Sequence, residues 1–339
     1  VEYSQITTAT TFTPTTQTGL VKVTVDGTDM TGGNIDINVD GSTVQNTASG
    51  QFENRVVNPA TSLTIVSNID GYEISSASYD SVSFSAAAQE SGTRDATFKP
   101  DGTKMYIVGN NKIIYQYTLS TPWVVSSASY DSVSFSVGSQ DTSAFSLAFK
   151  PDGTKFYLLG ATNDSVFQYT LSTAWDMSTA SYDSISFSVA SQETTPYGMT
   201  LKPDGTKLYI VGYVNDTVYQ YTLSTAWDLS TASYDSISFS VAVQDNSPRG
   251  LAFKTDGTKM YIVGTTNSTI FQYTLSTPWV VSSSSYDSVS FSVGAQETYP
   301  YSISFKTGGT KFYIIGNNNT VYQYTSSGVF AGTARISVG

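Results

Sequence analysis

Short stretches of apolar residues, separated by polar turns, recur along most of the chain and predict β-strands rather than helices. One representative stretch, 250–293, predicts four strands, which are Gly250–Phe253, Lys259–Val263, Thr269–Leu275 and Tyr286–Val293. The first two are joined through Asp256-Gly257, a hairpin signal because glycine adopts positive φ without steric cost. The second predicted strand carries apolar side chains on both faces, which is typical of a sheet that is covered on both sides.

This four-strand unit recurs five times, at steps of 51 or 52 residues. The turn motif DGTK begins at Asp101, Asp152, Asp204 and Asp256, and its fifth copy is GGTK at Gly308. The tripeptide QYT begins at Gln116, Gln168, Gln220, Gln272 and Gln323. The strand motif YDS(V/I)SFS begins at Tyr79, Tyr130, Tyr182, Tyr234 and Tyr286. Four strands in a unit of this length are typical of a propeller blade, so the sequence predicts an all-β, five-bladed β-propeller.

The positions of the first and last repeats predict how the ring closes. The four tryptophans each lie seven residues before a YDS tyrosine, and Tyr72 has the same offset before Tyr79. Phe330 follows Gln323 by seven residues, as Trp123 follows Gln116, so the repeat begins where it ends. The strand that starts at Tyr79 has no third strand of its own before it. We therefore predict that it is the outer strand of the last blade, which leaves no open sheet edge.

The remaining segments predict a second, smaller domain. Residues 1–18 are rich in threonine and are expected to form an extended arm. Residues 19–70 alternate like strands around two Asp-Gly turns and predict a small β-sandwich-like attachment domain, which residues 331–339 would complete. The propeller is expected to span 71–330.

Composition narrows the chemistry that the protein performs. The chain has 27 acidic and 16 basic residues, no cysteine and no histidine. These absences exclude disulfides, thiolate nucleophiles, Cys/His zinc sites and imidazole catalysis, and we expect no metal and no cofactor. A net charge of −11 argues against a nucleic-acid partner. No apolar run is long enough to span a membrane. The chain opens at Val1 without a leader, so we expect that a signal peptide is absent or was removed from a longer precursor.

The repeats resemble a known group of proteins. The segment 186–241, with its strings KPDGTKLYIVG and VYQYTLSTAW, is similar to the propeller repeats of virion and surface proteins of tailed phages of marine and fresh water, including cyanophages. It is more distantly similar to the PDG-x-x-x-Y-V blades of bacterial surface propellers. The resemblance covers about 72–330. It implies the fold, and it implies that ligands bind near the axis, on the face that carries the loops between blades.

Two sets of residues are candidates for a site on that face. The first set is a carboxylate after a glutamine in every copy, at Glu90, Asp141, Glu193, Asp245 and Glu297. These carboxylates either form a ring that holds a cation or sugar hydroxyls, or each caps its own loop by accepting backbone N–H bonds. Their presence in every copy favours capping.

The second set differs from copy to copy and lies where the inner strands begin, at Arg94, Phe145, Tyr197, Arg249 and Tyr301. Two arginines and three aromatic rings suit stacking on sugar faces and hydrogen bonding to hydroxyl or carboxylate groups. The alternative is that these large side chains plug the central channel and pair with the acidic ring. The opposite face carries one lysine per copy beside the tryptophans, with a charge that is expected to be solvated.

These features lead to a non-enzymatic phage virion surface protein, associated with the capsid as a decoration or fibre or with the tail. Residues 1–70 would bind other virion proteins, and the propeller would be displayed outside the particle for adhesion, including to host surface glycans. A secreted or cell-surface bacterial lectin or adhesin is the alternative. A glycan-cleaving enzyme is disfavoured because such enzymes need unlike carboxylates at the axis, and Asp95 alone is singular. The oligomeric state stays open, with a multimer on the particle as one alternative.

Overall fold

The structure, a computed structural model, describes residues 71–326 and eight strands outside them, at 2–4, 10–12, 21–30, 33–39, 42–47, 52–57, 63–69 and 330–338. Contacts divide the chain into two units. One unit is Val1–Ser76 with Ser326–Gly339, and the other is Ala77–Thr325, so the boundary lies a few residues inside the expected 71–330. In the part of the chain that the structure describes, no helix has the length and hydropathy of a membrane span.

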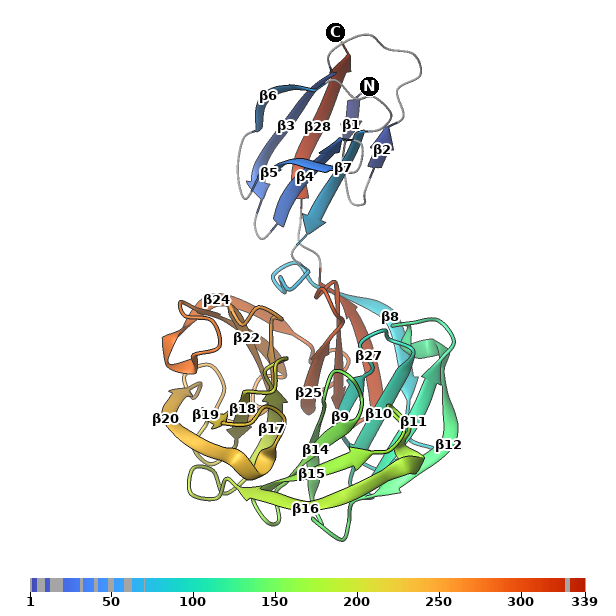
Figure 1. Cartoon of the computed structure of the whole chain (residues 1–339), viewed down its shortest axis with the longest axis vertical. Coiled ribbons are helices and arrows are strands. Elements are labelled where there is room, and N and C mark those ends of the chain that lie inside the picture. Colours follow the sequence, from blue (N-terminus) through green and yellow to red (C-terminus); the bar gives the residue numbers. More distant parts are fainter. Residues whose placement is uncertain are drawn as a thin grey trace. The chain divides into compact units, whose positions relative to one another are not determined.

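The smaller unit contains two four-stranded antiparallel sheets (Figure 1). Its strands are β1 (Glu2–Ser4), β2 (Thr10–Phe12), β3 (Val21–Met30), β4 (Gly33–Val39), β5 (Ser42–Thr47), β6 (Phe52–Val57), β7 (Leu63–Ile69) and β28 (Phe330–Val338). The sheet orders are β1-β28-β3-β6 and β2-β7-β4-β5. Strands β1 and β2 lie within the segment 1–18, for which the expectation is an arm, and β28 contains most of the segment 331–339. The last strand of the chain thus lies between strands formed by its first thirty residues.

The larger unit is a five-bladed β-propeller, as the sequence predicts (Figure 1). Blade 1 is β9 (Thr93–Phe98), β10 (Lys104–Gly109), β11 (Ile113–Leu119) and β12 (Ala128–Ser136). Blade 2 is β13 (Ala144–Phe149), β14 (Lys155–Gly160), β15 (Ser165–Leu171) and β16 (Ala180–Ser188). Blade 3 is β17 (Pro196–Leu201), β18 (Lys207–Gly212), β19 (Thr217–Leu223) and β20 (Ala232–Ser240). Blade 4 is β21 (Pro248–Phe253), β22 (Lys259–Gly264), β23 (Thr269–Leu275) and β24 (Ser284–Ser292). Blade 5 is β25 (Pro300–Phe305), β26 (Lys311–Gly316), β27 (Thr320–Thr325) and β8 (Ser78–Ser85).

Ring closure is also confirmed, because β8 pairs antiparallel with β27 as the outer strand of blade 5. The seam between the last blade and the first is packed like the others. Tyr313 of blade 5 lies against Phe98 of blade 1, with ring centroids 4.4 Å apart, and stacks on Trp123. Short 3-10 helices precede the outer strands of the first four blades, at Val125–Ser127, Met177–Thr179, Leu229–Thr231 and Val281–Ser283.

The second strand of every blade is buried on both faces, which explains why its apolar residues do not alternate with polar ones. Each contributes a buried tyrosine to the layer between blades, namely Tyr106, Tyr157, Tyr209, Tyr261 and Tyr313. The core is therefore a set of apolar layers between neighbouring sheets rather than one central cluster.

The loops fall on two faces of the propeller. On the first face, the turn between second and third strands contacts the loop that enters the blade, as where the Asn111 N–H donates to Glu90. On the second face, the Trp123 N–H donates to the carbonyl of Gly102 in the DGTK turn. Glycine is required there, because its φ is 75° and a Cβ would lie 2.4 Å from the tryptophan ring. The propeller begins and ends on the second face, since Ser78 pairs with Thr325 where other blades have their tryptophan loop.

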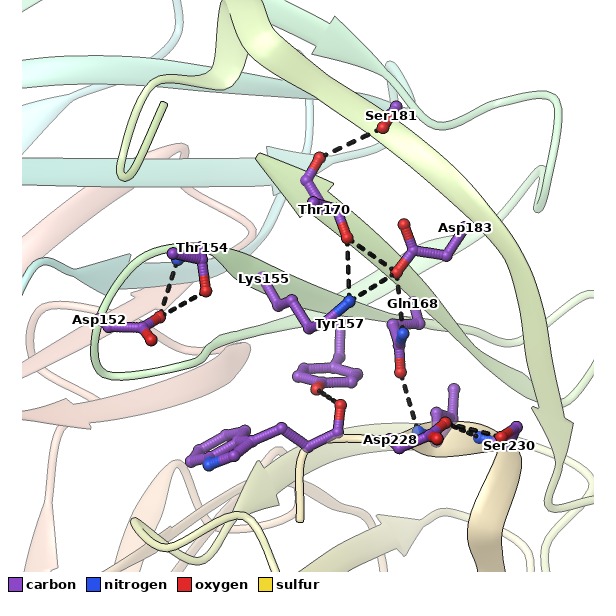
Figure 2. Close-up of polar contacts among 12 residues, drawn as sticks. Asp152, Thr154, Lys155, Tyr157, Gln168, Thr170, Ser181, Asp183, Asp228 and Ser230 are labelled. Atoms are coloured by element: carbon purple, nitrogen blue, oxygen red, sulfur yellow. Dashed lines mark hydrogen bonds and ion pairs between the residues drawn. The ribbon is translucent and has the colours of Figure 1, made fainter. Parts of the chain in front are cut away.

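A β-bulge in each outer strand aims the aspartate of the YDS motif inward. The serine after this aspartate has a φ of 58° or 59° in all five copies, and the register shifts at the same point in every blade. In blade 2 the bulge places Asp183 2.9 Å from the Lys155 ammonium and 2.8 Å from the Gln168 amide nitrogen (Figure 2). The lysine charge is thus paired in a half-buried site, and the expectation that it is solvated is wrong.

The same group of residues connects each blade to the next. Gln168 accepts a hydrogen bond through its amide oxygen from the Leu229 N–H of blade 3, at 2.8 Å (Figure 2). Beside it, the Tyr157 hydroxyl donates to the Trp227 carbonyl at 2.6 Å. Blades 1, 3 and 5 make the same two contacts to the blades that follow them. We call this arrangement of Lys, Asp, Gln and Tyr the inter-blade latch.

The latch makes stability depend on pH. Burial by itself raises the pKa of Asp183, but hydrogen bonds from Gln168, Lys155 and Thr170 outweigh it and hold the pKa below its usual range. A lowered pKa stabilises the folded state above the unfolded-state value of about 4, and this contribution is lost as the pH falls through the folded pKa. In Asp183→Asn we expect the free energy of unfolding to fall by about 2 kcal/mol at neutral pH. The difference from wild type should shrink below about pH 3.

Urea unfolding across this pH range measures both quantities. Lys155→Met and the double variant complete a cycle that isolates the ion pair from the loss of either side chain. A difference between Asp183→Asn and wild type that stays constant from neutral to acid pH would contradict the titration of this carboxyl.

Candidate ligand-binding face

The five repeated carboxylates are buried, with 0–1% of each residue exposed. Asp141 shows their arrangement, since it accepts hydrogen bonds from the backbone N–H groups of Ser143, Thr162 and Asn163 at 2.7–3.3 Å. Glu90, Glu193 and Glu297 likewise join the loop that enters the blade to the turn between its second and third strands. These carboxylates therefore cap their own loops, which is the alternative that their repetition in all copies favours.

Their burial leaves these carboxylates poorly solvated. Burial raises the pKa of Glu90, Asp245 and Glu297, against the opposing effect of the backbone N–H bonds that they accept. Glycines pack directly on them, as where a Cβ at Gly160 would lie 2.2 Å from the Asp141 carboxyl carbon. No exposed ring of carboxylates is present for a ligand, and we therefore place the candidate site on the second set of residues.

The five variable positions at the starts of the inner strands form one continuous belt. The Arg94 guanidinium lies 5.1 Å from the Phe145 ring centroid and 4.2 Å from that of Tyr301. Phe145 meets Tyr197 edge to face at 4.3 Å, and Arg249 lies 3.8 Å from the Tyr197 centroid and 5.8 Å from Tyr301. Cation–π contacts and aromatic packing thus connect all five, which are half-buried. We call them the axial belt.

The arginines of the belt do not pair with the acidic ring. Among the described residues neither forms an ion pair with a carboxylate. Arg94 donates from two nitrogens to the side-chain oxygen of Asn110, at 3.0 and 3.2 Å, and Arg249 donates to the Ser247 hydroxyl at 3.2 Å. Their charges are met by ring faces and neutral oxygens, which leaves further N–H donors for a ligand.

One residue further along each inner strand, hydrogen bonds and close packing join the inner strands below the belt. The Asp95 carboxylate accepts hydrogen bonds from Ser146 and the Leu147 N–H of blade 2, at 2.9 and 2.7 Å, and from Ser302 of blade 5. At the equivalent Gly198 and Gly250, a Cβ would lie 2.4 Å from a carbonyl oxygen and 2.7 Å from a valine methyl group. We call this the axial layer. Asp95 is thus a buried tie between three blades, and burial raises its pKa.

Sequence reasoning missed four exposed apolar residues in the loops of the first face. Within the described residues, the large hydrophobic side chains that are most exposed are Tyr213, Val214, Val243 and Tyr299, at 47%, 54%, 91% and 56%. All four lie in first-face loops of blades 3 to 5, and Arg249 lies 5.1 Å from the Tyr213 ring. We call them the apolar rim. These four residues differ from their counterparts in the other copies, which is the same sequence signal that marks the belt.

No metal centre is evident at this face. Across the residues that the structure describes, no group of three or more His, Cys, Asp and Glu side chains is arranged to hold an ion. What the first face offers is aromatic surface, guanidinium donors and exposed valines, an arrangement suited to noncovalent binding.

The axial layer supplies a test of the role of Asp95. In Asp95→Asn, an NH2 group replaces one of the two oxygens that accept from Leu147 and the serines, and we expect a loss of about 2 kcal/mol in the free energy of unfolding. Urea unfolding at neutral pH measures it. Asp164→Asn is the matched control, because Asp164 Oδ1 has no hydrogen-bond partner and blade 5 carries Asn319 at the same place. Equal midpoints for both variants and wild type would contradict a tie at Asp95.

The chain can be compared with known proteins by its sequence and by its structure. No protein-family model and no curated protein matches the chain. Among solved structures, the chain is similar to Chaetomium thermophilum Sqt1, seen bound to the N-terminus of the ribosomal protein L10. The identity is 11%, the match covers 69% of this chain and 71% of that chain, and the TM-score is 0.40. The five-bladed β-propeller is shown by the order and pairing of the strands themselves.

Proposed function

We propose that the chain is a non-enzymatic adhesion protein of a phage virion surface, in which the first face of the propeller binds host glycans. The observation that carries the binding proposal is the axial belt, where three aromatic rings and two guanidiniums meet at the axis. Aromatic faces stack on the C–H faces of sugars, and guanidiniums donate to their oxygens, which is a common pairing in carbohydrate sites. The placement on a virion rests on the resemblance of the repeats.

The carboxylates support a binding role rather than hydrolysis. A glycosidase needs one carboxylic acid and one carboxylate that both reach the glycosidic bond. The repeated carboxylates of the first face are buried and accept backbone hydrogen bonds, although Oδ2 of Asp245 has no hydrogen-bond partner, and Asp95 ties three blades together below the belt. None of these groups is placed to touch a sugar that lies on the belt.

The topology supports display of the first face. The propeller connects to the rest of the chain at Ala77 and Thr325, and both links leave from the second face. The first face therefore carries no covalent link. Residues 1–70 are proposed to bind other virion proteins, and the belt is proposed to bind the ligand.

The binding role is tested with the full-length chain on a glycan array. We expect wild-type signal on a defined group of glycans and a loss of about five- to tenfold in Tyr197→Ala, because stacking on an aromatic ring contributes roughly 1–1.5 kcal/mol. Lys202→Ala, which removes a cation from the second face, is the control and should bind as wild type does. A wild-type protein that binds no glycan on the array sinks the proposal.

The virion role is tested by mass spectrometry of purified particles. We expect the chain among the particle proteins, and we expect particles made with a chain that lacks residues 1–70 to have lost the propeller. The separated propeller should stay folded, since its five blades close without those residues. Particles that lack the full-length chain, or that keep the truncated one, would refute attachment through this segment.

A further inference from the structure

We infer that the glycan bound at the axial belt is an acidic one, recognised through a sugar carboxylate by Arg94 and Arg249. This inference rests on the proposed function, because it names the class of glycan that the same belt takes.

The first argument is that neither of the two arginines forms an ion pair among the described residues. On the second face, the lysines at the DGTK turns and in the latch are paired with aspartates at 2.6–3.2 Å. Arg94 and Arg249 have no such partner among the described residues, although five carboxylates lie on the same face. A ligand carboxylate supplies the missing anion, and its two oxygens fit the fork of a guanidinium.

The second argument is the balance of donors and acceptors at the belt. Arg94 uses two nitrogens on one neutral oxygen, and Arg249 donates from one Nη to Ser247, while its Nε is buried without a hydrogen-bond partner. The carboxylates nearby accept backbone N–H groups and are 0–1% exposed. Burial raises the pKa of Glu90 and the charge of Arg94 acts to lower it, but within the described residues the two groups do not form an ion pair. The belt thus presents an excess of donors. The hydroxyls of a neutral sugar both donate and accept, so such a sugar neither balances the excess of N–H donors nor neutralises the guanidinium charge.

The third argument is geometric. Both guanidiniums lie over the ring of Tyr301, Arg94 at 4.2 Å and Arg249 at 5.8 Å from its centroid, so donors flank an aromatic face. The axial layer lies directly below the belt, where Asp95 is 5% exposed and is held by donors of blades 2 and 5. A sugar whose C–H face lies on the belt therefore has its carboxylate beside the arginines.

The test compares charged and neutral forms of the same sugars. Oligosaccharides that carry uronic or sialic acids, each paired with its methyl ester, are titrated calorimetrically into the full-length chain at about 50 and 300 mM salt. We expect the acids to bind at least about tenfold more tightly than the esters and to weaken at high salt. Arg94→Gln and Arg249→Gln should each lose about tenfold for the acids and little for the esters, while Lys202→Gln on the second face changes neither. Thermal unfolding confirms that each variant is folded.

The outcomes separate this inference from the proposed function. Equal binding of acids and esters by the wild-type protein, or preference for neutral glycans, overturns acidic recognition and leaves glycan binding intact. Acid binding that survives both arginine substitutions overturns the assignment to the belt. Absence of binding to any acidic or neutral glycan overturns the inference together with the proposed function. The wild-type comparison of acid and ester decides the matter even if an arginine variant does not fold.

Discussion

The ring depends on how a buried glutamine is oriented between two blades. A carboxylate only accepts hydrogen bonds, so the aspartate in the β-bulge fixes the amide nitrogen of the glutamine toward itself, as Asp183 does with Gln168. The amide oxygen must then face the other way, toward the N–H at the start of the next blade's 3-10 helix. Lys155 offsets the negative charge that this arrangement buries. Removing any member leaves a polar group unsatisfied at the seam, which is why the motif recurs in every blade.

The residues of the latch recur in every blade, whereas the start of each inner strand and the first-face loops carry large side chains that differ from copy to copy. The inner strands start close together around the axis, so one equivalent position in each copy places five side chains in contact. Arg94, Phe145, Tyr197, Arg249 and Tyr301 are far apart in sequence and form one belt for this reason. The belt is a property of the ring rather than of any blade, and it exists only when the last blade closes on the first.

The repeated carboxylates and the variable belt residues have different roles, and the difference follows from whether a residue recurs in every copy. Carboxylates that occur in every copy, such as Asp141, serve a need that every blade has, namely satisfying backbone N–H groups where a loop and a turn meet. Residues that break the repeat serve no such common need. Asp95 combines both properties: it is singular in sequence, yet it serves as a structural tie, because the two neighbouring blades supply its hydrogen-bond donors.

The sequence by itself determined the blade number, the four strands of each blade and the closure of the ring through β8, since these follow from repeat spacing and strand patterning that are local in the chain. It also located the belt positions. It did not reveal the bulge at Ser184 or the pairing of Lys155 with Asp183, because both depend on how the outer strand pairs with the third strand of its blade. Only the tertiary structure decided that the ring carboxylates face backbone N–H groups and that the arginines of the belt face aromatic rings. Those partners come from separate loops and blades. Burial, rather than residue type, decides whether a polar group is available to a ligand or stabilises the fold.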